Sequence, residues 1–274
     1  ISCSMSRPPS EMIVMRHSER VDHMFKGWTV LANKDGVYTP YDHNMPSSLP
    51  IARPIDNYSL DSPITVNGKV LAEMAGANLR IAKHVPDIIY CSPSLRCLQT
   101  AHAVKFHTMS SAKLRIEPAL LEYPHAYRKC PPLATKEQRA QFDVDESYEQ
   151  WMSLEKLFNS EEKRKDYYAR LKDVLFHIAA KTEQQSFTIT AKPITVLVVG
   201  HATTVFRAAG VLTAEPKDPS LHDLQRVGDR VPYCGSVLFR RQSSGWQPQP
   251  AAIPSVVYGN LNTRIRFDQL YGSE

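Results

Sequence analysis

Two arginines flank a histidine directly after an apolar run near the start of the chain. The run covers Met12–Met15 and continues into Arg16-His17, with Arg20 three residues after the histidine. An imidazole nitrogen can attack phosphorus to form a phosphohistidine, and arginine side chains bind phosphate oxygens with paired N–H donors. A histidine between two arginines directly after a buried strand suits a packed core poorly, so a purely structural role is less favoured. The segment therefore predicts a phosphate site with His17 as the nucleophile.

Two further polar motifs follow apolar runs in the same way. Arg96 closes a Ser-Pro-Ser-Leu-Arg motif shortly after Ile88–Tyr90, and His201 follows the strongest apolar run, Ile194–Val199. Ligands of open α/β sheets bind beyond the carboxyl ends of the strands. We therefore expect Arg96 and His201 to converge with the first motif at one edge of a sheet, where a protonated His201 would donate to phosphate.

The leaving oxygen of a phosphate ester needs a proton, so a carboxylic acid is expected opposite the nucleophile. Glu122, which follows the apolar segment Leu114–Ile116, is the best candidate for this acid. Glu117 is the nearby alternative, although Glu117-Pro118 also suits the start of a turn.

Three neighbouring polar residues have less certain roles. The Ser18 hydroxyl is expected to donate to phosphate if the backbone permits it. Arg53 is expected either to reach the substrate or to brace the long loop around it. Glu19 is expected at a solvated helix start, where the helix dipole favours an acidic side chain.

The elements that must position these residues alternate between strands and helices. Thr65 is a suitable N-cap for the amphipathic segment that follows it. This order predicts an α/β fold with a mostly parallel central sheet and helices on both faces. The predicted strands are 12–15, 88–90, 114–116 and 194–199, with late strands at 237–239 and around Trp246; the predicted helices are 66–83, 95–106, 147–158, 161–181 and one after Thr204.

The chain is expected to form one domain over residues 12–274, preceded by a flexible segment at 1–11. It carries a long loop insertion at about 21–62, which has no sustained period. Five aromatic residues in the insertion argue against disorder: Phe25, Trp28, Tyr38, Tyr41 and Tyr58. Because position 1 is not methionine, we expect the chain to be part of a longer protein.

Composition narrows the class of partner. Hydrophobic residues make up 42% and charged residues 22% of the chain, as in globular proteins. The net charge of +5 is spread out, which favours anionic substrates over nucleic acid. No segment approaches the roughly 20 apolar residues that span a bilayer, so no membrane partner is expected. Five cysteines without Cys-x-x-Cys spacing favour free thiols and a cytoplasmic location.

Several motifs together resemble the histidine phosphatase superfamily, which has the phosphoglycerate-mutase-like fold. Within it, the chain resembles the phosphatase domains of the suppressor of T-cell receptor signalling proteins (UBA- and SH3-containing) and of the ecdysteroid-phosphate phosphatases. The resemblance extends from Met12 to about Tyr233. It is carried by Arg16-His17-x-Glu19-Arg20-Val21-Asp22, Asn44-Met45-Pro46-x-Ser48-Leu49-Pro50-x-x-Arg53, Asp61-Ser62-Pro63-Ile64-Thr65-Val66-x-Gly68, Tyr90-Cys91-Ser92-Pro93-Ser94-Leu95-Arg96-Cys97-x-Gln99-Thr100-Ala101-His102, Arg115-Ile116-Glu117-Pro118 and His201-Ala202.

The resemblance implies the same roles for the site residues as their chemistry indicates. His17 would accept the phosphoryl group, Glu122 would donate the proton, and the phosphate ligands would be Arg16, Arg20, Arg96 and His201. It also implies a domain that usually dimerises and that uses neither cofactor nor metal. The expected activity is hydrolysis of phosphomonoesters, with phosphotyrosine protein, steroid-like phosphate and small metabolites all open as substrates. Mutase chemistry is a less favoured alternative.

Two positions depart from the family pattern. Ser18 stands where family members have glycine, and a serine there fits without strain only if its φ is negative. Tyr123 stands where the signalling proteins have tryptophan, which alters the pocket wall more than the acid. Ser18 therefore motivates an alternative function: a weakly active or inactive domain that serves as a binding or dimerisation module.

Overall fold

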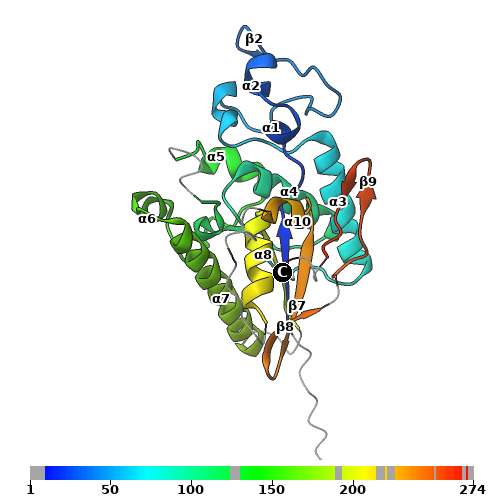
Figure 1. Cartoon of the computed structure of the whole chain (residues 1–274), viewed down its shortest axis with the longest axis vertical. Coiled ribbons are helices and arrows are strands. Elements are labelled where there is room, and N and C mark those ends of the chain that lie inside the picture. The colour runs from blue at the N-terminus through cyan, green and yellow to red at the C-terminus, as the bar shows by residue number, and fades with distance from the viewer. Residues whose placement is uncertain are drawn as a thin grey trace, which may run out of the picture.

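The described strands of the central sheet are arranged in the order β5-β4-β6-β1-β7-β8 in a computed structural model of the chain (Figure 1). The model describes residues 10–123, 130–188, 193–213, 220, 226–249, 251–266 and 270. Neighbouring strands from β5 to β1 are parallel, whereas β7 and β8 are antiparallel. The bounds are β1 (Glu11–Arg16), β4 (Ile88–Cys91), β5 (Leu114–Ile116), β6 (Thr195–Gly200), β7 (Ser236–Gln242) and β8 (Gly245–Gln249). The expected mostly parallel sheet is confirmed.

Helices cover both faces of the sheet, as the alternation along β1 shows. Ile13 and Met15 pack into the apolar cluster built with α3 (Val66–Ile81) and α4 (Leu95–Thr108). Met12 and Val14 point to the other face, into the cluster built with α7 (Arg164–Thr188) and α8 (Ala202–Val211). Figure 1 shows α7 and α8 to the left of the sheet and α3 to the right. Because both faces are covered, the strand is continuously apolar, which is the pattern that the sequence showed.

Helices α3 and α4 pack closely and begin where their N-terminal donors find partners. The Thr65 hydroxyl accepts from the Gly68 N–H at 2.9 Å, so the predicted N-cap is confirmed. The Leu95 N–H at the start of α4 donates to Asp61 Oδ1 at 2.8 Å. At Gly76 an added Cβ would lie 2.7 Å from the Val104 carbonyl oxygen, so glycine permits the close approach of the two helices.

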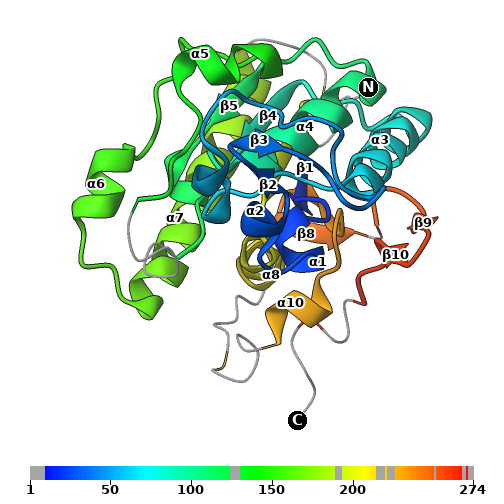
Figure 2. The same ribbon diagram turned by 90° about the horizontal axis from the view of Figure 1, so that it is seen from above.

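The insertion at 21–62 lies above the carboxyl ends of the parallel strands (Figures 1 and 2). It contains α1 (Val21–Met24), α2 (Trp28–Leu31), β2 (Asn33–Lys34), β3 (Val37–Tyr38) and the 3-10 helix η1 (Ile55–Ser59). Trp28 is only 2% exposed, and its ring lies about 6 Å from the rings of Tyr38 and Tyr58. Packed aromatic side chains thus organise a segment that has no sequence period.

The predicted helix at 147–158 is wrong over its first half. Only α6 (Leu154–Asn159) forms there, because the preceding residues donate to the buried carboxylate of Glu117. The Tyr148 hydroxyl and the Trp151 N–H reach Glu117 Oε2 at 2.7 and 2.8 Å. A tertiary partner therefore overrides local helix propensity.

The remaining elements are short. They are the 3-10 helices η2 (Pro118–Leu120) and η4 (Ala140–Phe142), the helices α5 (Lys136–Arg139) and α10 (Val227–Arg230), and the strands β9 (Val257–Tyr258) and β10 (Leu261–Asn262). The proposed N-terminal segment 1–11 lies largely outside the described residues, and β1 already begins at Glu11. Within the described part of the chain, no helix is long and apolar enough to cross a membrane.

Candidate active site

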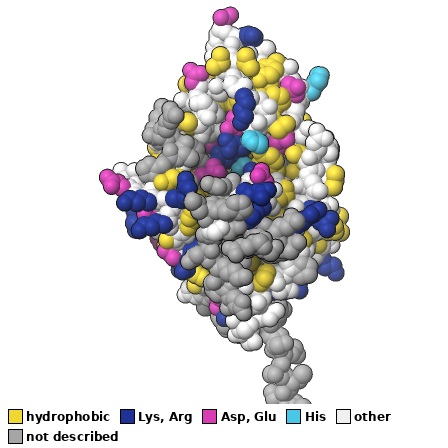
Figure 3. All heavy atoms as spheres, viewed as in Figure 1, with side chains coloured by type: hydrophobic (Ala, Val, Ile, Leu, Met, Phe, Trp, Pro, Cys, Tyr) yellow, Lys and Arg dark blue, Asp and Glu magenta, His cyan; other side chains and the backbone are white. Residues whose placement is uncertain are grey.

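The three predicted motifs meet at one edge of the sheet. Strand β6 lies between β1 and β4, and the register pairs Arg16 with Gly200 and Cys91 with Val199. The carboxyl ends of the three strands are therefore level, and the rings of His17 and His201 lie 5.5 Å apart. Figure 3 shows arginine or lysine, histidine and carboxylate side chains gathered in a hollow below the insertion.

The His17 imidazole is held in one orientation. Its Nδ1 lies 2.8 Å from the Ser18 carbonyl oxygen, which can only accept a hydrogen bond. Nδ1 therefore carries a proton, and the lone pair of the neutral ring is on Nε2. Burial, followed by the charges of Arg96 and Arg16, lowers the pKa of His17 well below its ordinary value. His17 is thus a neutral imidazole at neutral pH, as a nucleophile must be.

Arg96 contacts two further predicted site residues, Glu122 and His201. Its Nη2 lies 2.5 Å from Glu122 Oε2 and 3.3 Å from His201 Nδ1. Because a guanidinium only donates, His201 Nδ1 accepts in this contact, and Nε2–H donates to Ser92 Oγ at 2.9 Å. Arg96 is 1% exposed, whereas a third of the Glu122 side chain is exposed. Glu122 thus faces the hollow beside a buried guanidinium.

The charges in this group shift the ionisation of both neighbours of Arg96. Burial lowers the pKa of His201 to about 3, although the Glu122 charge opposes this. Burial would raise the pKa of Glu122, but His201, Arg96 and Arg20 together lower it far below its ordinary value. At neutral pH the free protein therefore has a neutral His201, and Glu122 is ionised before an anion binds.

Two backbone carbonyl oxygens and an aromatic ring hold Arg16. Its Nη1 donates to the carbonyl oxygens of Gly228 and Val231 at 3.1 and 2.5 Å. The Tyr233 ring lies 4.3 Å from the centre of the guanidinium, within range of a cation–π interaction. The buried Arg16 Nε has no hydrogen-bond partner among the described residues. Arg16 thus keeps a donor that an anionic ligand could use.

Arg20 lies at the edge of the group. Its Nε donates to Asp22 Oδ1 at 2.7 Å, and its Nη2 donates to Asp22 Oδ2. Its side chain is 29% exposed. The Arg20 charge contributes to the lowered pKa values of His17 and Glu122, so its positive charge acts on the same site.

Ser18 is accommodated without backbone strain. It is not among the residues with positive φ, and its N–H donates to Thr100 Oγ1 at 2.9 Å. Its hydroxyl donates to the Gly68 carbonyl oxygen at 2.6 Å, so its proton is used within the protein. The negative-φ alternative describes this serine.

Arg53 braces the insertion. It is buried in an ion pair with Asp61, with Nη1 at 3.2 Å from Oδ2, and it stacks 4.0 Å from the Tyr58 ring. Asp61 in turn accepts from the first N–H of α4, the helix that carries Arg96. Of the two expected roles, these contacts favour bracing over substrate binding.

The two carboxylates near β5 have different environments. Glu117 is completely buried and accepts from Ala119 N–H at 3.0 Å as the N-cap of η2. It also accepts the donors from 148–152 described above, so its oxygens are occupied. Glu122 is therefore the carboxylate that faces the arginines and His201.

Sequence patterns missed two residues of this site and misplaced a third. Ser92 holds His201, and Tyr233 packs on Arg16 and lies 5.9 Å from the His17 ring. Tyr233 precedes β7, an antiparallel strand that starts beside the end of β1. A prediction of this pairing could have placed Tyr233 near His17. Glu19, expected to be solvated, is 3% exposed. It accepts from Thr65 Oγ1 at 2.7 Å and from Asn44 Nδ2 at 3.0 Å, and so ties the insertion to the start of α3.

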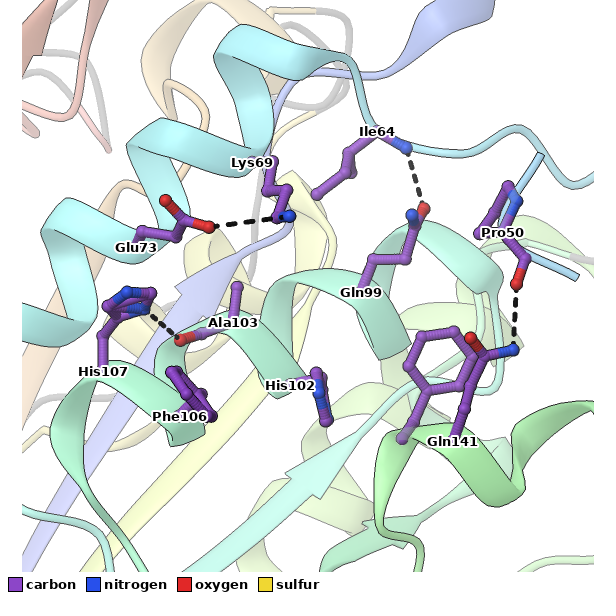
Figure 4. A pocket seen from close by; sticks show the side chains of 11 residues that line it. Pro50, Ile64, Lys69, Glu73, Gln99, His102, Ala103, Phe106, His107 and Gln141 are labelled. Atoms are coloured by element: carbon purple, nitrogen blue, oxygen red, sulfur yellow. Dashed lines mark hydrogen bonds and ion pairs between the residues drawn. The ribbon is translucent and has the colours of Figure 1, made fainter. Parts of the chain in front are cut away.

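A pocket of about 340 Å³ lies on the outer side of α4, and none of the predicted site residues lines it (Figure 4). Several of its polar groups bind one another. Lys69 lies 3.9 Å from Glu73, Gln99 accepts from the Ile64 N–H, and Gln141 donates to the Pro50 carbonyl oxygen. The chemistry is therefore assigned to the hollow at the strand ends and not to this pocket.

The chain matches a family model and several known proteins. The model of the histidine phosphatase superfamily (branch 1) matches residues 57–246. Ecdysteroid-phosphate phosphatase of Drosophila melanogaster is 30% identical over 95% of this chain and 34% of its own length. Human ubiquitin-associated and SH3 domain-containing protein B is 31% identical over 82% of this chain and 34% of its own length. The chain thus spans about a third of the length of these relatives.

Solved structures show the shared fold. The crystal structure of the ecdysone phosphate phosphatase of Bombyx mori in complex with tungstate has a TM-score of 0.76 at 24% identity, covering 92% of this chain and 96% of that one. Phosphoglycerate mutase from Bacillus anthracis has a TM-score of 0.50 at 15% identity, covering 90% and 94%. By its match to the family model and its identity with these relatives, the chain belongs to the histidine phosphatase superfamily, branch 1.

Proposed function

We propose that the chain is a phosphomonoesterase that needs no metal and works through a phosphohistidine at His17. The observation that carries the proposal is the neutral imidazole of His17, with its lone pair on Nε2, at the same strand edge as Arg16, Arg96 and Glu122. Three guanidinium groups near this edge, with Arg20 as the third, match the charge that spreads over the phosphoryl oxygens in the transition state. The match to a phosphatase supports the hydrolysis of phosphate esters.

In the first step, the Nε2 lone pair of His17 forms a bond to phosphorus while the bond to the leaving oxygen breaks. A proton passes from Glu122 to that oxygen, and the alcohol departs. In the second step, water attacks phosphorus as Glu122 removes its proton, the N–P bond breaks, and inorganic phosphate leaves. The carboxyl group alternates between acid and base, so both steps balance.

The proton on Glu122 arrives with the substrate. The carboxyl is ionised in the free protein because the surrounding positive charges lower its pKa. A phosphate monoester ionises a second time near pH 6, so part of the substrate still carries a proton near neutrality. Bound phosphoryl oxygens also compensate the arginine charges, which raises the pKa of the neighbouring carboxyl.

The substrate class is proposed to be a phosphate ester of an aromatic or largely apolar alcohol, either phosphotyrosine in a protein or a steroid-like phosphate. Tyr233 lies between His17 and His23, and its hydroxyl is 2.8 Å from His23 Nδ1. In the insertion, Phe25 and Tyr41 form an edge-to-face pair, with half of the Tyr41 side chain exposed. The Tyr233 ring beside the nucleophile suits such leaving groups.

The direct test is hydrolysis of p-nitrophenyl phosphate by the purified chain in buffer that contains a metal chelator. The proposal predicts steady release of phosphate that is unaffected by the chelator. Absence of hydrolysis toward aryl phosphates, phosphotyrosine peptides and steroid phosphates alike would contradict it.

The second candidate function is a weakly active or inactive domain that binds a partner or dimerises, and Ser18 is the observation that favours it. Replacing Ser18 by glycine discriminates the two. We expect less than a threefold change in kcat/KM, because Ser18 has an unstrained φ and its hydroxyl binds Gly68. A gain of several orders of magnitude in the steady-state assay would show instead that serine disables the site.

We further propose that the domain forms a homodimer and acts in the cytoplasm. The family resemblance supports the dimer, and the described cysteines, all unpaired, support a reducing compartment. Light scattering on the purified chain and imaging of the tagged full-length protein test these two points separately.

A further inference from the structure

A buried arginine on α7 binds the backbone that carries Glu122. Arg170 is 5% exposed, and its Nη1 donates to the carbonyl oxygens of Ala119 and Leu121 at 2.6 and 3.0 Å. Leu121 immediately precedes Glu122 and has an extended backbone, with φ −62° and ψ 149°. Two hydrogen bonds from one rigid group therefore fix the path of the chain just before the acid.

A carboxylate on the opposite side fixes Arg170 itself. Glu162 accepts from Arg170 Nε at 2.6 Å and from Nη2 at 2.9 Å, and both side chains are almost fully buried. The planar guanidinium thus binds a carboxylate through one edge and two carbonyl oxygens through Nη1. A lysine cannot reproduce this fork, because its ammonium has neither the shape nor the fixed directions.

The same arginine is connected to the other side of the site. The Tyr167 ring lies 5.0 Å from the Arg170 guanidinium and 5.8 Å from the ring of Tyr123, the residue that directly follows Glu122. The Tyr167 hydroxyl is hydrogen-bonded to the Thr203 hydroxyl, near the start of α8 and two residues after His201. Residues on both sides of Glu122 are therefore held by neighbouring side chains of α7.

We propose that Arg170, held by Glu162, is a positioning residue that sets the Glu122 carboxyl at the leaving oxygen of the substrate. This inference rests on the proposed function, in which Glu122 is the acid. A displacement of about 1 Å at a reacting group costs on the order of 100-fold in rate. Loss of Arg170 should therefore impair proton donation and leave the nucleophile and the arginines in place.

Leaving groups of different basicity separate this role from general stability. Departure of an alkoxide or phenoxide needs a proton from Glu122, whereas 2,4-dinitrophenoxide leaves without one. The value of kcat/KM reports events up to the departure of the leaving group, so it is the appropriate measure. We would compare an alkyl phosphate, phenyl phosphate and 2,4-dinitrophenyl phosphate.

The variants are Arg170→Met, Arg170→Lys and the double variant Arg170→Met/Glu162→Met. The double variant leaves no unpaired buried charge, so it guards against misfolding of the single variant. Arg240→Met is the matched control, because it breaks an ion pair at 2.8 Å with Glu11, the first residue of β1, at the opposite end of that strand from His17. Thermal unfolding of each variant confirms that it is folded.

We expect Arg170→Met and the double variant to lower kcat/KM about 10- to 100-fold for phenyl and alkyl phosphates and less than threefold for the dinitrophenyl ester. Arg170→Lys should recover part of the loss, and Arg240→Met should change none of the three. Equal losses for all three esters in the folded variants, or no loss, would overturn the inference. Glu122→Gln, measured in parallel, separates the role of Glu122 as the acid from the role of Arg170 in positioning it. If the loss of kcat/KM depends on the leaving group in Glu122→Gln but not in the Arg170 variants, only the positioning role is contradicted.

Discussion

Replacing His17 by alanine is expected to lower kcat/KM for phosphomonoesters by at least about four orders of magnitude, because no other group then forms the bond to phosphorus. The side chain is 2% exposed and contacts the Ser18 carbonyl oxygen through Nδ1, so the phosphate ligands should keep their places. The measurement is steady-state hydrolysis of an aryl phosphate, with vanadate binding as a check that the anion site persists.

His107→Ala is the matched control for this variant. His107 lies in the last turn of α4 and takes no part in the site. The control should hydrolyse the ester at the wild-type rate. If His17→Ala retained a rate within tenfold of the control, His17 would not be the nucleophile.

Replacing Glu122 by glutamine is expected to lower kcat/KM by about 100- to 10,000-fold for an alkyl phosphate, since glutamine cannot supply the proton. With 2,4-dinitrophenyl phosphate the loss should be less than about tenfold. Removing the negative charge also leaves the buried Arg96 without this ion pair, so anion binding should not weaken. A uniform loss for both esters would contradict the role of Glu122 as the acid.

The pH dependence follows from the direction of the same shifts. A lowered pKa keeps His17 neutral well below pH 6.5, so kcat/KM should not fall as the pH is lowered through 6.5. As the pH rises above about 6, the substrate loses the proton that Glu122 requires, so kcat/KM for an alkyl phosphate should decline. With the dinitrophenyl ester, whose leaving group needs no proton, wild-type kcat/KM should lack this decline. These pH profiles of kcat/KM are measured together with the Glu122→Gln comparison.

Local patterns predict the framework of the fold because each is decided within a few residues. The apolar run before Arg16 forms β1, and Thr65 caps α3 as expected. The convergence of His17, Arg96 and His201 follows from parallel topology alone, because strand ends meet at one edge. That part of the site therefore needs no knowledge of side-chain packing.

What the sequence does not predict depends on partners far along the chain. Glu117 draws residues 148–152 out of a helix, and no local pattern records that contact. Glu19 is polar in a polar segment, yet Thr65 supplies a buried donor for it. Arg53 has a buried partner in Asp61, which decides between bracing and substrate contact. Arg170 belongs to the same class, since its partners lie about 50 residues earlier.

The central claim is that turnover passes through a phosphohistidine at His17, and trapping this species tests it most directly. The wild-type chain is mixed with a fast-reacting aryl phosphate and quenched in base within a single turnover, since phosphohistidine survives base. Peptide mapping by mass spectrometry then locates the phosphoryl group. The account predicts phosphate on Nε2 of His17, and none in the His17→Ala variant. Full turnover with the phosphoryl group on another side chain, or on none, would contradict it.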